Sequence, residues 1–128
     1  YSWADFDVIH AFTIDTANNK LFETIASAST IDGVGMPIGG MSLSANGTQL
    51  DSGIIWATIG PRVDKKDLTG VVYAFDATDL KHILWHSELN ADQDALGKLA
   101  KFNPPIVANG KVYVSTFSNQ LVVYGLLN

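Results

Sequence analysis

Residues 70–85 read GVVYAFDATDLKHILW, and this stretch decides the fold class that the sequence predicts. It holds an apolar run, a polar segment that begins at Asp76, and a second apolar run that ends in Trp85. Short β-branched and aromatic runs that are bounded by turn-forming residues are typical of β-strands. The stretch therefore predicts two strands joined by a turn.

Partial copies of this stretch lie on both sides of it, and two pairs of landmarks have the same spacing. The pair Ala11-Phe12 precedes the pair Ala74-Phe75 by 63 positions, and Asn46-Gly47 precedes Asn109-Gly110 by the same 63 positions. Units of about four short strands, without a helix long enough to cover a sheet, are the pattern of β-propeller blades. A two-sheet β-sandwich is the competing architecture, but it gives no reason for a repeat of this length.

Further strands are predicted where apolar runs are separated by Gly, Asn, Asp and Pro: at 1–3, 8–14, 21–26, 41–45, 53–59, 106–108, 111–117 and 120–126. Residues 27–40 are rich in glycine and predict a loop. Asn46-Gly47 predicts a tight hairpin turn, because both residues tolerate positive φ. Residues 90–102 predict a helix of one or two turns, capped by Asn90 and weakened by Gly97.

These strands predict an all-β fold of β-propeller blades, each of them a four-stranded antiparallel sheet. Residues 1–128 would form a single partial propeller of about two and a half blades. The end of one blade is predicted at 1–26, a complete blade at 38–87, and three strands of a further blade at 103–128. Because such an arc has unpaired sheet edges, we expect the remainder of a larger propeller, or another chain, to complete the blades.

Charge and composition argue against several classes of partner and site. The chain has 128 residues, 47% of them hydrophobic, and its 8 Lys and Arg against 13 Asp and Glu give a formal net charge of -5. Without a basic patch, binding to nucleic acid or to an anionic membrane surface is not expected. No apolar run is long enough to cross a bilayer. The absence of cysteine excludes disulfides and thiolate metal sites.

No set of residues predicts a catalytic centre or a metal site. His82 and His86 are four positions apart, but no third ligand has a recognisable spacing, so solvent-facing histidines are the simpler interpretation. Asp92 and Asp94 are either carboxylates for acid–base chemistry or calcium, or the acidic first turn of the short helix. The helix interpretation is the simpler of the two.

One segment is a candidate ligand-binding site. Lys101, Phe102 and Asn103 place a cation, an aromatic ring and an amide just before the first strand of a predicted blade. In a propeller the loops at this point border the central channel, where ligands commonly bind. The alternative is that Phe102 packs in the fold and Lys101 is solvated.

A family resemblance rests on two segments, GVVYAFDATDLKHILW at 70–85 and PPIVANGKVYVSTFSNQLVVYGL at 104–126. Their landmarks resemble the repeats of the quinoprotein-dehydrogenase-like, or PQQ-like, β-propellers over nearly the whole chain. In that family a strand ends in Ala-x-Asp, and a tryptophan docks between blades. The resemblance therefore implies docking roles for Ala74, Asp76 and Trp85. In the earlier copy, Thr13 stands at the Asp position and Phe22 near the Trp position.

The resemblance implies a secreted or periplasmic protein and leaves two functions open. The first is a non-catalytic propeller segment that acts as a structural or ligand- or protein-binding scaffold within a larger propeller. The alternative is a C-terminal fragment of a PQQ-dependent oxidoreductase acting on an alcohol or sugar, with PQQ and calcium as cofactors. The turn Thr78–Lys81 lacks the glycine of the family pattern, which favours the scaffold.

Overall fold

The computed structural model describes residues 1–4, 6–32, 40–60 and 69–126. Within them the chain is built from short strands and one helical turn: β1 Ser2–Trp3, β2 Val8–Asp15, β3 Lys20–Asp32, β4 Gly40–Ser44, β5 Ile54–Ile59, β6 Val71–Asp76, β7 Ile83–His86, α1 Ala91–Asp94, β8 Ile106–Ala108, β9 Lys111–Ser115 and β10 Leu121–Tyr124. The predicted all-β class is confirmed.

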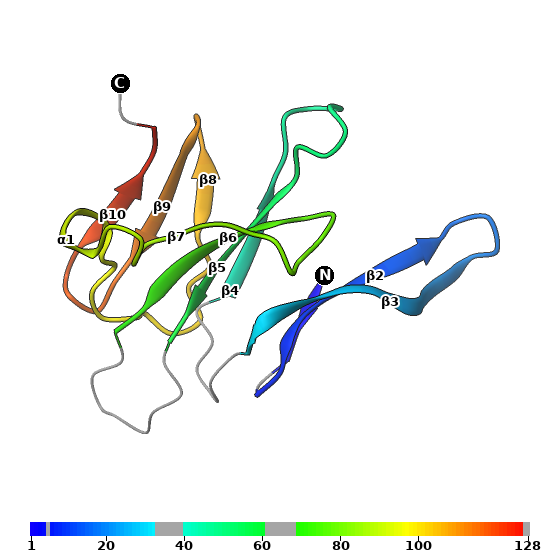
Figure 1. Ribbon diagram of the computed structural model, residues 1–128, viewed down its shortest axis with the longest axis horizontal. Coiled ribbons are helices and arrows are strands. Elements are labelled where there is room, and N and C mark those ends of the chain that lie inside the picture. The colour runs from blue at the N-terminus through cyan, green and yellow to red at the C-terminus, as the bar shows by residue number, and fades with distance from the viewer. Residues whose placement is uncertain (5, 33–39, 61–68, 127–128) are drawn as a thin grey trace.

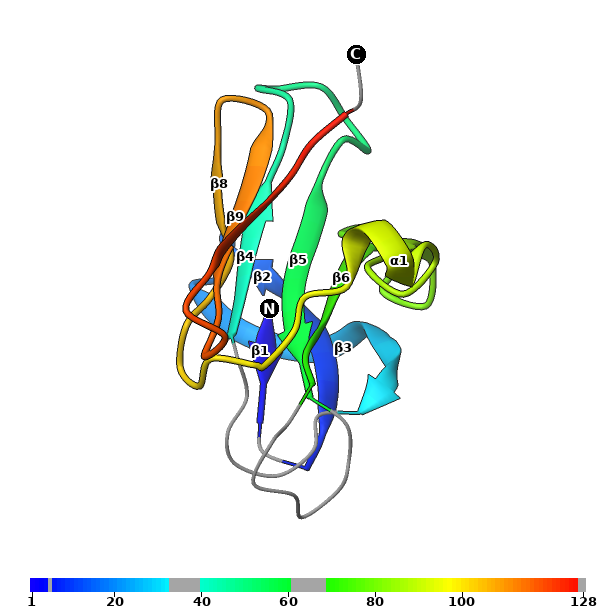
Figure 2. The same ribbon diagram turned by 90° about the vertical axis from the view of Figure 1, so that its left-hand side faces the viewer.

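The described strands form three antiparallel sheets that follow one another along the chain (Figure 1). The N-terminal sheet has the order β1-β2-β3, the central sheet β4-β5-β6-β7, and the C-terminal sheet β8-β9-β10. The first strands of the central and C-terminal sheets, β4 and β8, lie side by side in both views (Figures 1 and 2). Successive sheets are therefore neighbours in space as well as in sequence.

One face of the central sheet packs against the N-terminal sheet. Side chains alternate between the two faces of a strand, so Ile55 and Ala57 share a face with Phe75, which lies directly opposite Ile55. These three side chains form one buried cluster with Ile9 and Ala11 of β2. Removal of this apolar surface from water is the main force that holds the two sheets together.

The opposite face of the central sheet packs against the C-terminal sheet. Val72 forms a second buried cluster with Val112 and Val114 of β9, and the partly buried Trp56 and Trp85 pack against it. The central sheet is therefore covered on both faces. This explains why its middle strands, β5 and β6, are apolar in both alternating sets of positions and do not have one polar side.

The two Asn-Gly pairs form different connections. Ala108 pairs with Lys111, and both Asn109 and Gly110 have positive φ (51° and 70°), as a two-residue type I′ turn requires. Asn46-Gly47 was predicted to form a hairpin turn, and it lies in the connection of the β4–β5 hairpin. Gly47 has φ 56°, and the N–H of Gln49 donates to the Asn46 carbonyl oxygen at 3.0 Å. The connection as a whole is longer than a two-residue turn. Strand pairing stops at Ser44 opposite Ile54, and the longer connection is closed by its own polar groups, including a 2.7 Å hydrogen bond from Asn46 Nδ2 to the Gln49 side chain.

Two further predictions are corrected by the fold. β3 continues through Asp32, so residues 27–32 are strand and not loop, because they pair with β2 as far as Val8 opposite Asp32. The helix predicted within 90–102 forms as one turn, Ala91–Asp94, but the predicted side-chain cap from Asn90 is absent. The chain beyond it is extended because Leu96 and Leu99 are buried between the central and C-terminal sheets.

No helix among the described residues is long and apolar enough to cross a membrane. Part of the glycine-rich stretch, at 33–39, and the charged stretch at 61–68 lie outside the described residues, as do residues 127–128 of the last predicted blade.

Candidate functional site

The segment singled out from the sequence does not bring its three side chains together. Lys101 is exposed, and Phe102 is 71% exposed. The backbone of Phe102 has φ 57°, a conformation that side chains with a Cβ rarely adopt. Asn103 is half-buried, and its side-chain amide donates a hydrogen bond to Ser115 Oγ on β9. The amide therefore anchors the loop, while the cation and the ring face solvent.

The residues after this segment pack closely against the start of β4. Gly40 has φ 108°, and a Cβ built on it would lie 3.1 Å from Cα and Cβ of Pro104. Only glycine therefore fits at this point, where the loop before β8 crosses the first residue of the central sheet. Pro105 is fully buried. The segment thus contributes to the contact between sheets.

Trp85, one of the three expected docking residues, lies between the central and C-terminal sheets. It is half-buried on β7 opposite Ala74, whose small side chain is 1% exposed. The Trp85 ring lies 5.2 Å from the ring of Tyr124 on β10 in an edge-on arrangement, and 6.5 Å from the ring of Trp56. Such aromatic pairs contribute about 0.5–1.5 kcal/mol beyond the area that they bury.

Tyr124 also connects the C-terminal sheet to the segment around α1. Its hydroxyl donates a 2.9 Å hydrogen bond to the carbonyl oxygen of Asp94. Burial raises the pKa of Tyr124 to about 12, and the nearby Asp94 carboxylate adds to the rise. The phenol is therefore neutral at physiological pH and acts as a hydrogen-bond donor within a packed cluster.

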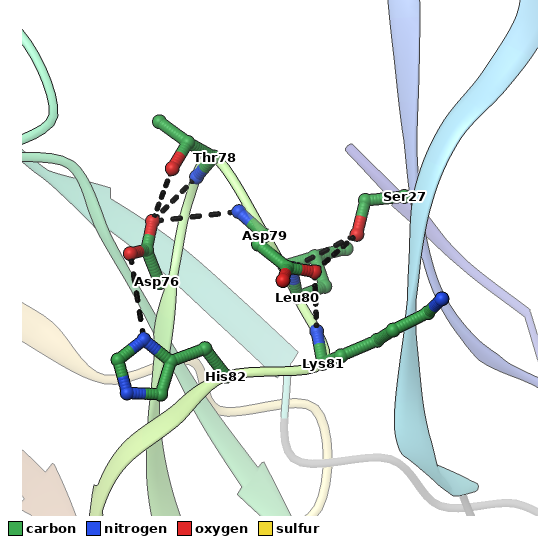
Figure 3. A network of polar contacts seen from close by, with 7 residues as sticks. All are labelled: Ser27, Asp76, Thr78, Asp79, Leu80, Lys81 and His82. Atoms are coloured by element: carbon green, nitrogen blue, oxygen red, sulfur yellow. Dashed lines mark hydrogen bonds and ion pairs between the residues drawn. The ribbon is translucent and has the colours of Figure 1, made fainter.

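Asp76, the second expected docking residue, organises the turn between β6 and β7 (Figure 3). Its Oδ1 accepts hydrogen bonds from the backbone N–H of Thr78 at 2.8 Å and from the Thr78 hydroxyl at 2.7 Å. These bonds lower the pKa of Asp76 below the usual value for aspartate. A carboxylate that accepts N–H groups two residues ahead is the Asx turn, which holds the chain at the end of the strand.

This turn also contacts the N-terminal sheet through Ser27 of β3 (Figure 3). Ser27 Oγ donates to Asp79 Oδ1 at 3.2 Å and accepts a hydrogen bond from the backbone N–H of Leu80 at 3.0 Å. Leu80 is fully buried in the cluster between the two sheets. The polar contact therefore fixes the turn in the position at which the leucine can insert.

Asp15 has the same role in the N-terminal sheet, at the turn between β2 and β3. Its Oδ1 accepts hydrogen bonds from the backbone N–H groups of Ala17 and Asn18, and its Oδ2 accepts one from Asn18 Nδ2. The bonds from Asn18 lower its pKa. The 63-residue alignment places Thr13 at this point, but β2 continues for two more residues before the turn. The cluster DTANNK at 15–20 predicts a turn here, because Asp and Asn favour Asx turns, and this turn is confirmed.

Two buried serines occupy matching places in the N-terminal and central sheets. The backbone N–H of Ile9 on β2 donates to Ser29 Oγ on β3 at 3.0 Å, and the N–H of Val72 on β6 donates to Ser87 Oγ, just beyond β7, at 3.1 Å. Ile9 and Val72 are 63 positions apart, and both serines are buried. The same kind of contact therefore occurs at Ile9 and at Val72.

Replacing Ser87 with alanine is expected to lower the free energy of unfolding by about 1–3 kcal/mol, because the buried N–H of Val72 would lose its acceptor. Ser29→Ala should have a cost within about 1 kcal/mol of this value if the two sites are equivalent. Urea titration of both variants measures the costs, with Ser2→Ala, at an exposed position on β1, as the control. A cost below about 0.5 kcal/mol for both buried serines would contradict their role.

Comparisons of the chain with protein-family models, with curated proteins and with solved structures find no match. The residues and their geometry therefore carry the functional argument.

The histidines and two of the tryptophans have other partners in the described structure. No group of three or more His, Asp or Glu side chains is arranged to hold a metal ion in the parts of the chain that the structure describes. His82 is exposed, and its Nδ1 lies 3.7 Å from Asp76 Oδ2, whereas the His86 ring is tilted against the Tyr73 ring with centroids 5.5 Å apart. The two histidines therefore have separate partners. Trp56 and Trp85 are occupied by packing between sheets.

The surface of the C-terminal sheet that faces away from the central sheet is the clearest unexplained feature. Ile106, Leu121 and Val123 are 62%, 63% and 47% exposed. Ile106 and Val123 both pair with Tyr113 of β9, so Ile106, Tyr113 and Val123 form one row across β8, β9 and β10. Leu121 lies two residues from Val123 on the same face of β10. We call Ile106, Tyr113, Leu121 and Val123 the outer apolar face. Exposed apolar patches of this kind mark interaction sites.

Proposed function

We propose that this chain is a non-catalytic scaffold of β-propeller type, whose three sheets are consecutive blades and whose outer apolar face binds further β-structure. The partner is the remainder of a larger propeller or another chain. The observation that supports this most strongly is the exposure of Val123. Ile9 and Val72, at the matching places in the other two sheets, are 0% exposed because the next sheet covers them, whereas Val123 is 47% exposed.

The match between Val123 and Val72 rests on position and not only on residue type. Each precedes a tyrosine, Tyr73 or Tyr124, that points back towards the preceding sheet. Val72 lies in the third strand of the central sheet counted from β4, and Val123 lies in the third strand of the C-terminal sheet counted from β8. β4 and β8 are themselves neighbours. The face that carries Ile9 in the N-terminal sheet and Val72 in the central sheet is covered by the next sheet in both cases. The same face of the C-terminal sheet, at Val123, is open, which favours a further sheet that covers it.

Light scattering tests the scaffold proposal. We expect the chain to have an average mass above the 13.8 kDa of the monomer, rising with concentration, because the outer apolar face associates. Ile106→Lys should shift the population towards the monomer, since a lysine ammonium is costly to bury in an apolar contact.

Leu50→Lys is the matched control. Leu50 is 86% exposed in the loop after β4, so this variant should associate as the unmodified chain does. A well-dispersed monomer at all concentrations would contradict the proposal, as would association that Ile106→Lys leaves unchanged.

A further inference from the structure

The C-terminal sheet ends in an edge strand, β10, and alternate residues of this strand direct their N–H and C=O groups away from the sheet. β10 is the last strand of its sheet, and no other described strand pairs with it on the side away from β9. The N–H of Thr116 donates to the carbonyl oxygen of Gln120, so Gln120 directs its backbone groups towards β9. Because direction alternates along an antiparallel strand, Leu121 and Val123 direct theirs towards the open edge.

The central sheet shows how the corresponding edge is used. Val72, which matches Val123, donates its outward N–H to Ser87 Oγ, and its carbonyl oxygen accepts a 2.9 Å hydrogen bond from the N–H of Ser87. In the N-terminal sheet the N–H of Ile9 also donates to a buried serine, Ser29. In both sheets a serine in or directly after the outermost strand therefore accepts the N–H at this position.

We propose that the open edge of β10 binds an extended antiparallel strand that contains a serine, and that this serine hydroxyl accepts the N–H of Val123 while its own N–H donates to the Val123 carbonyl oxygen. This inference rests on the proposed function, since it names the chemistry of the partner that the scaffold takes. Addition of a strand to a sheet edge supplies affinity through backbone hydrogen bonds and specificity through alternate side chains. Here the serine is the specific element.

A peptide with the sequence of residues 81–90, KHILWHSELN, is the probe, because the chain itself places this segment beside β6. Fluorescence anisotropy of the labelled peptide should rise saturably as the 128-residue protein is added. Replacing the peptide serine with alanine should weaken binding by roughly fivefold, the ratio that corresponds to one lost hydrogen bond. N-methylation of the serine amide should weaken it by roughly tenfold or more, because the methyl group also blocks close approach of the strands.

Two controls separate edge pairing from other modes of binding. N-methylation of the peptide residue that corresponds to His86 should leave the affinity within about twofold, since Tyr73 opposite it directs its backbone groups towards β5 and the His86 N–H points away from the ladder. In the protein, Val123→Pro removes the outward N–H at an edge position where proline is tolerated and should abolish binding. Val123→Ala keeps that N–H and should retain binding. Circular dichroism and urea titration verify that both variants fold.

Absence of saturable binding up to about 1 mM peptide would overturn the inference. So would binding that Val123→Pro leaves intact, because the peptide would then have replaced β7 beside β6. The two proposals fail separately. If Ile106→Lys abolishes association but no peptide binds, only the proposed strand site at β10 is contradicted. If the peptide binds but the chain never associates, only the proposed covering of the outer apolar face is contradicted.

Discussion

Replacing Phe75 with alanine is expected to lower the free energy of unfolding by about 3–5 kcal/mol, the range for a fully buried phenylalanine. Phe75 is 0% exposed and lies in the cluster that joins the N-terminal and central sheets. Its ring also stacks on that of Tyr73 with centroids 5.7 Å apart. The truncation therefore removes both apolar burial and a ring contact at the place where two sheets meet.

Urea titration with linear extrapolation measures this loss, and an unchanged slope would show that the variant still unfolds from a compact state. Phe102→Ala is the matched control because the same atoms are removed from a side chain that is 71% exposed. Its effect should stay within about 0.5 kcal/mol. A cost for Phe75→Ala below about 1 kcal/mol would mean that the N-terminal sheet does not pack on the central sheet.

Replacing Trp85 with alanine is expected to cost about 2–4 kcal/mol, less than the roughly 3–5 kcal/mol expected for a fully buried tryptophan. The reduction follows from the structure, since Trp85 is half-buried. The remaining cost reflects its edge-on contact with Tyr124 and its packing on the cluster between the central and C-terminal sheets.

A double-mutant cycle isolates the contact between these two sheets. Trp85→Ala combined with Tyr124→Leu should show a coupling of about 0.5–1.5 kcal/mol, the contribution of one aromatic pair. The control cycle pairs Trp85→Ala with Tyr73→Leu, because Tyr73 packs in the cluster on the other face of the central sheet. That pair should be additive within about 0.5 kcal/mol. Equal coupling in both cycles would indicate a general loosening and not a contact between Trp85 and Tyr124.

Local sequence was sufficient wherever a short segment determines its own conformation. Asn109-Gly110 forms the tight turn that its residues predict, since both adopt the positive φ that a type I′ turn requires. The carboxylate of Asp76 holds its turn through Thr78, which is two residues away. The four strands between 40 and 86 were likewise visible as apolar runs bounded by turn residues.

Local sequence was misleading where distant residues compete for the chain. The segment after Asp94 has helical signals, yet it is extended because Leu96 and Leu99 are buried against strands of two sheets. Residues 27–32 read as loop, yet they are strand because β2 offers a pairing partner. Local sequence was also misleading in the candidate site, where residues distant in sequence set the position of each side chain. Lys101, Phe102 and Asn103 are adjacent in sequence, but their surroundings separate the anchored amide from the exposed ring.

The sequence by itself determined that this protein is made of short β-strands in a repeated order, because strand propensity and turn chemistry are properties of a few neighbouring residues. Only the tertiary structure decided which apolar faces are covered. Val72 and Val123 are the same residue type in matching places, yet one is fully buried and the other is 47% exposed. Burial depends on whether a further sheet lies against the strand, and that is a property of the assembled fold.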